Sequence, residues 1–500
     1  MNPHAQYLQA VTRRHFLQHC QVGLGGIALS TLLGAAPATA RASQGNDPQN
    51  TVPRSRSSKK SGPMSPKSPH FRPRAKRVIY LHMAGSPSQL DLFDYKPELV
   101  ARNGQPCPDA FFKNERFAFI KGHPKLLGSP YAFGQHGQGG LWISELLPRL
   151  GSIADELTVV HSMNTDQFNH APAQLLLHTG SPRLGYPSMG AWATYGLGTE
   201  NQDLPGFVVL ISGGSTPSAG KSLWGSGFLS GIYQGVQCRS VGDPILFVSN
   251  PSGMTREVRR QSLDALADLN RIQAEAFGDP ETLTRIEQFE LAYRMQSSVP
   301  GVMDITRESP ATRAMYGAQP GQPLFANNCL LARRLVEQGV RFVQLFDYGW
   351  DHHGTSQGDD IVHALPRKCR AVDRPIAALI RDLKQRGLLD ETLVIWGGEF
   401  GRTSMNEKRG GSKFLGRDHH PRAFTMFFAG GGMKPGVIRG ATDELGYYPV
   451  EAPMGIRDLQ ATVLHLLGFD ARRLSFPLQG LNARLIGPTD EGQVCRDILA

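Results

Sequence analysis

The second half of the chain alternates helical and extended patterns, and this alternation limits the fold more than any other feature. From Phe325 onward, NNCLLARRLVEQG shows the apolar spacing of a helix and leads to VRFVQLF, a short apolar run typical of a buried strand. RAVDRPIAALIRDLKQRG then leads to TLVIWGGEFG, and FTMFFAGG follows. Helices and strands in this order predict an α/β fold with a doubly wound, mixed, mostly parallel sheet and helices on both faces.

Three earlier segments have the character of buried strands, namely VIYLHM (78–83), LTVVHSM (157–163) and FVVLIS (207–212). Residues 264–296 show helical periodicity. A chain of 500 residues with 40% apolar content can bury a large core. We therefore expect one folded domain over residues 77–500.

The net charge of +10 is concentrated at the amino terminus. Residues 1–76 hold 11 of the 53 Lys and Arg residues but one of the 43 acidic residues, so the remainder of the chain is neutral. A basic surface for DNA or RNA would need its charge on the folded part. The sequence thus predicts no nucleic-acid partner.

The first forty residues resemble a Tat export signal. Arg13 and Arg14 precede an apolar run of 15 residues, VGLGGIALSTLLGAA, and a small-x-small site follows at residues 38–40. The run is shorter than the roughly 20 residues that span a bilayer. We expect a signal peptide over residues 1–40, a disordered basic Ser/Pro-rich linker over 41–76, and a periplasmic or extracellular protein that touches a membrane only through an uncleaved signal. The alternative is an ordinary buried helix.

Acids and histidines follow or precede the predicted strands, where ligands of doubly wound sheets gather. Candidate metal ligands are Asp91, Asp351, His353, Glu399, Asp418, His419 and His420. Carboxylates and imidazoles converging from several strands are what a divalent cation requires, here zinc, manganese or calcium. Each cluster taken alone could instead cap or solvate a loop. His82 lies inside a predicted strand and is more typical of a core histidine.

Long motifs resemble a known family. They are HMAGSPSQLDLFDYKPEL, FNHAPAQLLLHTGSPRLGYPSMG, GWDHHG, GGEFGRT, GRDHHPRAFTMFFAGGGMKPG and DLQATVLHLLG. They are similar to a Tat-exported, sulfatase-like family, the domain of unknown function number fifteen hundred and one. RGLLDETLVIWGGEFG also resembles the alkaline-phosphatase superfamily. The resemblance spans about residues 76–500 and implies an alkaline-phosphatase/sulfatase-like fold.

The same resemblance implies one metal site and an eroded second one. Asp351 with His353 resembles the Asp and His pair of one superfamily site, and the His of GRDHHP resembles its final histidine. His170 stands where a sulfatase has its nucleophile. Phe400 replaces a ligand of the second metal motif, and Glu399 replaces the acid before it.

These features predict an exported metal-dependent hydrolase of sulfate or phosphate esters, in which metal-activated water attacks without a protein nucleophile. The expected catalytic residues are His170, Glu399, Arg402 and Arg417, with His170 as ligand or general acid and base and either arginine holding the anionic group. The expected substrate is a small anionic ester or a sulfated polysaccharide. The alternative is a non-catalytic, metal-containing carbohydrate-binding or assembly protein of the same fold.

Overall fold

The computed structural model describes residues 62–113, 115–245, 249–277, 280–488 and 492–500. The chain divides into two units, residues 1–60 and 61–500, and every described element belongs to the second. The expected signal peptide, and the expected linker up to residue 61, lie outside the described residues.

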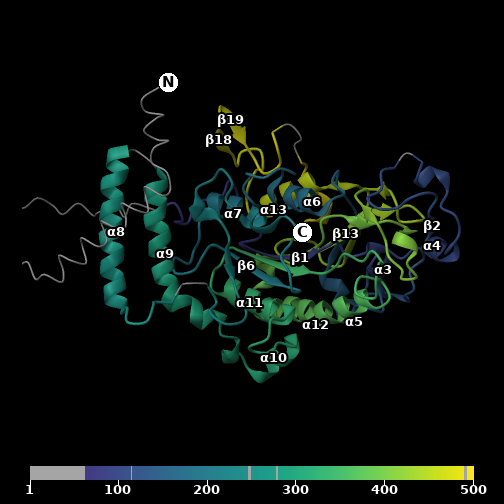
Figure 1. Cartoon of the computed structure of the whole chain (residues 1–500), viewed down its shortest axis with the longest axis horizontal. Helices are drawn as coiled ribbons and strands as arrows, with labels where there is room; N and C mark the ends of the chain where they lie inside the picture. The colour runs from purple at the N-terminus through teal and green to yellow at the C-terminus, as the bar shows by residue number, and fades with distance from the viewer. Residues whose placement is uncertain (1–61, 114, 246–248, 278–279, 489–491) are drawn as a thin grey trace, which may run out of the picture. The chain divides into compact units, whose positions relative to one another are not determined.

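A nine-stranded sheet forms the centre of the second unit (Figure 1). Its strand order is β14-β5-β13-β9-β1-β8-β6-β7, with β17 paired to β5. The strands are β1 (Arg77–Ala84), β5 (Thr158–Asn164), β6 (Phe207–Ser212), β7 (Val236–Cys238), β8 (Phe342–Tyr348), β9 (Thr392–Gly397), β13 (Phe424–Ala429), β14 (Val437–Arg439) and β17 (Met454–Gly455). β13 is antiparallel to β5 and β9, and the other pairs are parallel. The predicted mixed, mostly parallel sheet is confirmed.

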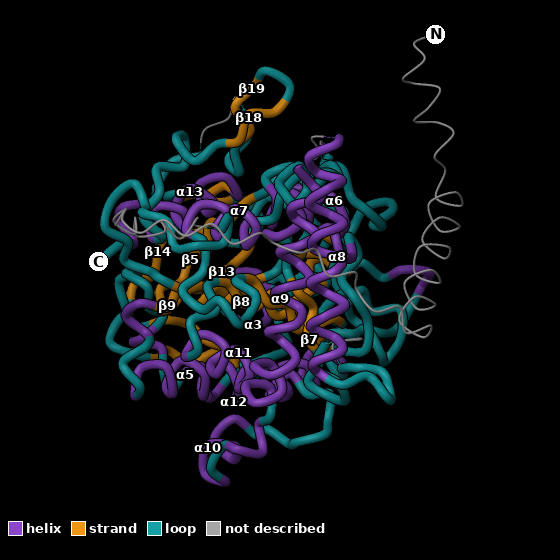
Figure 2. Tube along the Cα trace, turned by 90° about the vertical axis from the view of Figure 1, so that its left-hand side faces the viewer, coloured by secondary structure: helices purple, strands orange, loops and turns teal. Residues whose placement is uncertain are grey.

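Helices cover both faces of the sheet, because the central strands carry apolar side chains on both faces. In β1, Ile79 and Leu81 face one core, and Val78 and Tyr80 face the other. The first core is closed by α5 (Pro148–Gly151), α11 (Phe325–Glu337) and α12 (Ala364–Gln385). The second is closed by α6 (His170–Thr179), α7 (Met189–Leu197) and α13 (Ile456–Leu466). Figure 2 shows the two helical layers on opposite sides of the strands.

The central strands bring the predicted polar loops to one edge. β1 lies between β8 and β9, with Ala84 beside Tyr348 and His82 beside Gly397. The loops after these three strands therefore leave the sheet together. Because β13 runs the opposite way, the loop that precedes it reaches the same edge. This placement agrees with the expectation from the strand pattern.

Short elements complete the part of the fold that the structure describes. Five two-stranded ribbons are β2 (Lys125–Leu126) with β11 (Met405–Asn406), β3 (Phe133–His136) with β4 (Leu141–Ser144), β10 (Gly401–Arg402) with β12 (His419–His420), β15 (Ala441–Thr442) with β16 (Pro449–Glu451), and β18 (Phe476–Leu478) with β19 (Leu481–Ala483). The short helices α3 (Gln89–Leu92) and α4 (Pro97–Ala101) follow β1. Thus β10 and β12, which carry predicted site residues, pair with each other.

Two long helices, α8 (Arg256–Phe277) and α9 (Pro280–Met303), form a hairpin beside the sheet (Figure 1), and α10 (Pro310–Tyr316) packs on α11 and α12. None of the helices in the described part of the chain is both long and apolar enough to cross a bilayer.

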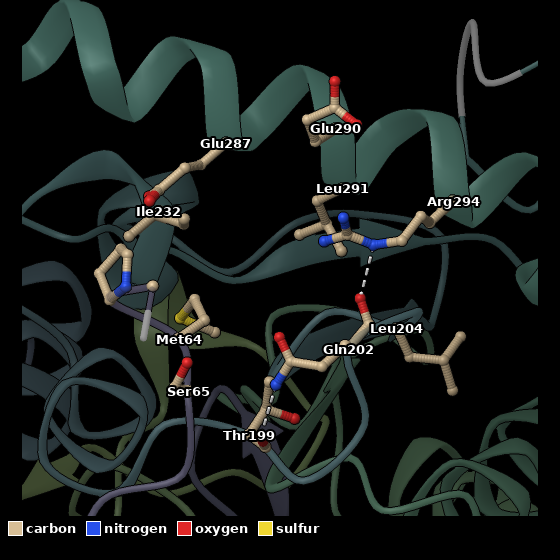
Figure 3. A pocket seen from close by; sticks show the side chains of 12 residues that line it. Met64, Ser65, Thr199, Gln202, Leu204, Ile232, Glu287, Glu290, Leu291 and Arg294 are labelled. Atoms are coloured by element: carbon tan, nitrogen blue, oxygen red, sulfur yellow. Dashed lines mark hydrogen bonds between the residues drawn. The ribbon is translucent and has the colours of Figure 1, made fainter. Parts of the chain in front are cut away.

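The folded unit begins before residue 77, so the expected linker is too long at its carboxyl end. The backbone N–H of Lys67 donates to the carbonyl of Leu197, and those of Arg74 and Ala75 donate to the carbonyl of Leu466. Residues 62–65 line a cavity of about 220 Å³ against α9 (Figure 3). Residues 62–76 are rich in Pro and Ser. They are held in place by contacts with distant parts of the chain, which local composition does not reveal.

Candidate metal centre

Four side chains from three parts of the chain converge at the edge of the sheet. They are His170 at the start of α6, Asp351 and His353 after β8, and His419 in β12. Their ligand atoms all lie within 4.8 Å of one another. Asp351 is the centre: its carboxylate lies 2.8 Å from His353 Nε2 and 3.3 Å from the Nε2 atoms of both His170 and His419.

Each of the three imidazoles is held by its other ring nitrogen. Nδ1 of His170 lies 2.7 Å from Glu399 Oε1, and Nδ1 of His419 lies 2.8 Å from the carbonyl oxygen of Phe168. Nδ1 of His353 contacts the Glu407 carboxylate. Carboxylate and carbonyl oxygens accept hydrogen bonds, so each Nδ1 is the donor. The Nε2 atoms therefore face Asp351, as ligand atoms face the ion in metal sites whose histidines are oriented by a second set of acceptors.

The loops approach closely because two glycines stand at their crossings. Gly85, directly after β1, has φ +108°, and a Cβ there would lie 2.6 Å from the Asp351 backbone nitrogen. A Cβ on Gly416 would lie 2.0 Å from the carbonyl carbon of His353. A side chain at either position would force these loops apart. The close approach of the backbone at these two glycines therefore helps to position Asp351 and His353.

The charges of the cluster favour an ionised carboxylate. Burial alone would raise the pKa of Asp351, but the Arg402 guanidinium and the hydrogen bonds from the three histidines hold it well below its usual value. Burial would lower the pKa of His170, but the nearby carboxylates of Asp351 and Glu399 outweigh burial and raise it to about 9. Burial is the main cause that lowers the pKa of His419 to about 4. The group therefore contains an ionised carboxylate in Asp351 and a neutral imidazole in His419.

Glu399, expected to be both ligand and catalytic residue, lies behind His170 and outside the converging group. It is fully buried, and its Oε1 also accepts bonds from Gln174 Nε2 at 2.8 Å and the Gly85 N–H at 3.2 Å. Its pKa is held well below the usual value, because hydrogen bonds from His170 and His82 outweigh the effect of burial. Glu399 is placed to orient His170.

His82 and His178 continue this network into the core. His82 Nε2 lies 3.3 Å from Glu399 Oε2, and His82 Nδ1 lies 3.3 Å from His178 Nε2. The Gln344 amide lies 3.0 Å from His178 Nδ1. The interpretation of His82 as a core histidine with polar partners agrees with these contacts, which also connect it to the site.

Asp91 and Arg417 were expected to serve the metal and the substrate anion, but they pair with each other. Arg417 Nε and Nη2 lie 2.8 and 3.0 Å from the two oxygens of Asp91, and both side chains are fully buried. A bidentate pair satisfies both charges. Neither residue belongs to the converging group, so these two expectations are corrected.

Two other predicted ligands point elsewhere. The carboxylate of Asp418 accepts the backbone N–H groups of Phe119, Ile120 and His419 at 2.7 to 2.9 Å. It lies near His353 and Glu407 in a second group of three possible ligands. Nε2 of His420 lies 2.6 Å from the Tyr447 carbonyl oxygen, outside both groups. Of the adjacent histidines, His419 is the one that faces Asp351.

Arg402 was expected to hold the substrate anion, but its donors are already occupied. It lies 2.5 Å from Asp351 Oδ1 and donates to the carbonyl oxygens of Gly85, Ser86 and Arg417. The side chain is buried. Its position indicates that it holds Asp351 in place rather than a ligand.

Sequence reasoning missed Glu407 and Gln174, which orient His353 and Glu399. Glu407 lies in the polar run RTSMNEKR, which reads as an ordinary solvated loop. Gln174 lies on α6, four residues after His170. That spacing places both side chains on one helix face, and it is the one signal that could have identified Gln174.

Comparison with known proteins gives a family match and distant structural likenesses. Residues 75–499 match the model of a family described as "Protein of unknown function (DUF1501)". No curated protein is similar enough to match.

Among solved structures, PsFucS1 sulfatase from Pseudoalteromonas sp. is 13% identical, and the match covers 84% of this chain and 73% of that one at a TM-score of 0.34. Lipoteichoic acid synthase LtaP from Listeria monocytogenes is 12% identical, with 81% and 76% covered and a TM-score of 0.36. Alkaline phosphatase from the Antarctic bacterium TAB5 is 10% identical, with 74% and 94% covered and a TM-score of 0.31. At this distance, the likenesses say nothing of the activity of this chain.

Proposed function

The chain belongs to the DUF1501 family of proteins of unknown function, and we propose that it is a metal-dependent hydrolase of sulfate or phosphate esters. One observation carries the proposal: three imidazole Nε2 atoms and a carboxylate lie within 4.8 Å of one another at the open edge of the sheet. Catalytic metal sites differ from closed structural ones by keeping access for substrate. The Asp351 side chain is 37% exposed and that of His170 is 17% exposed, which supports a site open to solvent.

The residues fit a divalent cation. His170 Nε2 is buried, and its contact with the Asp351 carboxylate, at 3.3 Å, lacks the geometry of a hydrogen bond, so this atom is available to a metal. Three nitrogen ligands and one oxygen ligand suit zinc, and manganese next. Calcium, which was also expected as a candidate, prefers a shell of oxygens and fits this set less well.

A divalent cation bound there supplies Lewis acidity to the ester oxygen and activates water for attack. Asp351, His170, His353 and His419 would hold it, and Glu399, Glu407 and the Phe168 carbonyl keep the three rings in the ligating orientation. The hydrogen-bond and ion-pair partners of the four ligands include no Ser, Thr or Cys in the described part of the chain. This supports direct attack by water. We further propose Tat export to the periplasm or the cell exterior.

Metal analysis followed by a substrate screen tests the proposal. Protein purified without chelator should contain about one divalent ion per chain, and Asp351→Ala and His353→Ala should reduce it severalfold. His363→Ala is the matched control, because His363 lies at the start of α12 and pairs with Asp360. Aryl sulfates and aryl phosphates should be hydrolysed by the parent protein, and His419→Ala should abolish this. A parent protein that contains no metal would refute the proposal. A His419→Ala variant that keeps the activity would refute it as well.

The second candidate is a non-catalytic protein that binds metal and carbohydrate, and Phe400 is the observation that favours it. This buried ring lies 4.9 Å from the His170 ring and 4.6 Å from the His419 ring. It thus fills space beside two ligands where the resembling superfamily has another metal ligand. Stoichiometric metal with no hydrolysis of either ester class would favour this candidate.

A further inference from the structure

Basic side chains are concentrated on two loops that flank the metal centre. β2 and β11 pair antiparallel, with Leu126 beside Met405, so the loop before β2 and the loop after β11 leave the same ribbon. We define the basic rim as Arg116, Lys121, Lys125, Lys408, Arg409 and Lys413. Beyond residue 76 the chain is neutral, so this concentration does not follow from overall composition.

The acids on these loops are already engaged. Glu115 accepts a bond from the Tyr448 hydroxyl at 3.0 Å and lies 3.5 Å from Arg422. Glu407 pairs with His353 and Arg409. Within the residues that the structure describes, Arg116, Lys408 and Lys413 form no ion pair with an acid. Their positive charge is available to a ligand.

Arg409 connects the basic rim to the metal centre through Phe119. The guanidinium carbon lies 3.6 Å from the centroid of the Phe119 ring, and that ring lies 5.0 Å from the His353 ring and 5.6 Å from the His419 ring. Nη2 of Arg409 is buried and lacks a hydrogen-bond partner among the described residues. A buried donor without an acceptor indicates that an acceptor is supplied from outside.

Arg116 is connected to the metal centre through a second aromatic residue, Phe168. Its guanidinium lies 5.1 Å from the centroid of the Phe168 ring, and the Phe168 carbonyl oxygen accepts the bond from His419 Nδ1. A guanidinium over an aromatic face keeps donors free for an anion. Thus each arginine is separated from a proposed ligand by one aromatic residue.

We propose that the basic rim binds a sulfated polysaccharide, placing one sulfate ester at the metal centre and its neighbours along the ribbon of β2 and β11. This proposal rests on the proposed function. A sulfated glycan repeats along its length the same monoester that the centre would hydrolyse, whereas a polynucleotide carries diesters. Arginine and lysine side chains on two adjoining loops suit such repeated anions.

Binding of dextran sulfate, with unsulfated dextran as reference, tests the basic rim in metal-loaded protein. The triple variant Arg116→Ala/Lys408→Ala/Lys413→Ala should bind dextran sulfate at least tenfold more weakly at low salt, and its affinity should depend less on salt. Arg116→Lys/Lys408→Arg/Lys413→Arg should stay within twofold of the parent. A control variant on α12, Arg370→Ala/Arg381→Ala/Lys384→Ala, removes the same number of positive charges. Its affinity for dextran sulfate should also stay within twofold of the parent, because α12 packs on α10, α11 and α5.

Equal binding by the parent and the alanine triple variant would overturn the proposal, and so would tighter binding of a single-stranded polynucleotide than of dextran sulfate. Hydrolysis of 4-nitrophenyl sulfate by the parent is measured alongside. Hydrolysis together with unaltered polymer binding in the triple variant would refute the basic rim alone. Loss of polymer binding in that variant, with no hydrolysis by the parent, would support the basic rim and refute the hydrolase.

Discussion

Each histidine of the metal centre faces Asp351 with one ring nitrogen and is hydrogen-bonded through the other to an acceptor behind it. Three histidines present Nε2 to Asp351, and each donates a hydrogen bond from Nδ1 to an acceptor further out. Two of these acceptors are carboxylates, Glu399 and Glu407, and the third is a backbone carbonyl. A carboxylate behind an imidazole fixes its tautomer and raises its basicity as a ligand. The outer residues should therefore affect metal affinity without touching the ion.

Glu407 provides the sharpest test at this scale. Glu407→Ala should weaken zinc binding by about 10- to 100-fold, because His353 loses the acceptor that orients it. Glu407→Gln, which keeps an acceptor oxygen, should lose less. Competition with a chromogenic chelator measures both affinities. Glu444→Gln, at an exposed position, is the control. If Glu407→Ala bound zinc as tightly as the parent, the orienting role would be wrong.

At the scale of elements, the site is assembled by joining loops that the sequence separates widely. The Asp91–Arg417 pair connects α3 to the segment before β12 across 326 positions of sequence. Arg417 also donates to the carbonyl oxygens of Leu127 and Thr403, so it holds the start of the ribbon β10–β12 in place. These contacts indicate a structural role for both residues.

Removing one member of this pair should be costly. Asp91→Ala leaves the Arg417 charge buried and unpaired, and we expect the free energy of unfolding to fall by about 3–5 kcal/mol. Asp91→Leu/Arg417→Met should recover much of that loss, because no unpaired charge remains. Urea denaturation measures the stabilities, and metal content per folded chain should be the same in the double variant as in the parent. A double variant that folds but contains no metal would restore Asp91 as a ligand.

For the whole molecule, buried neutral histidines should make stability depend on pH. Burial lowers the pKa of His161 in β5, with Lys96 lowering it further and Asp94 opposing, and burial lowers that of His178 in α6 well below the usual value. A group with a lowered folded pKa binds its proton first in the unfolded chain. Stability is therefore fully present above the unfolded value of about 6.5 and is lost as the pH falls below it.

The expected loss is up to about 1.4 kcal/mol per pH unit for each such histidine. His161→Phe should reduce the slope of unfolding free energy against pH between about 6.5 and 5, as measured by urea denaturation at several pH values. His363→Phe, at a histidine whose side chain is 43% exposed, is the control. Equal slopes in the parent and His161→Phe would contradict the assignment.

The sequence by itself determined the sheet and the loops that would carry chemistry. The regular alternation after Phe325 predicted the central strands β8, β9 and β13 and the helices α11 and α12, because local apolar periodicity is set by which faces a helix or strand must bury. The same alternation predicted that Asp351, His353 and His419 would lie at one edge of the sheet. These three residues lie in the converging group together with His170.

Only the tertiary structure decided which polar residues face one another. Asp91, Asp418 and His420 have the same chemical types as the ligands of the centre, and no local pattern separates a ligand from a side chain that pairs with a buried arginine or with a backbone group. The partner of a side chain depends on register, on close crossings at Gly85 and Gly416, and on loops distant in sequence. These are long-range contacts, and periodicity along the chain carries no information about them.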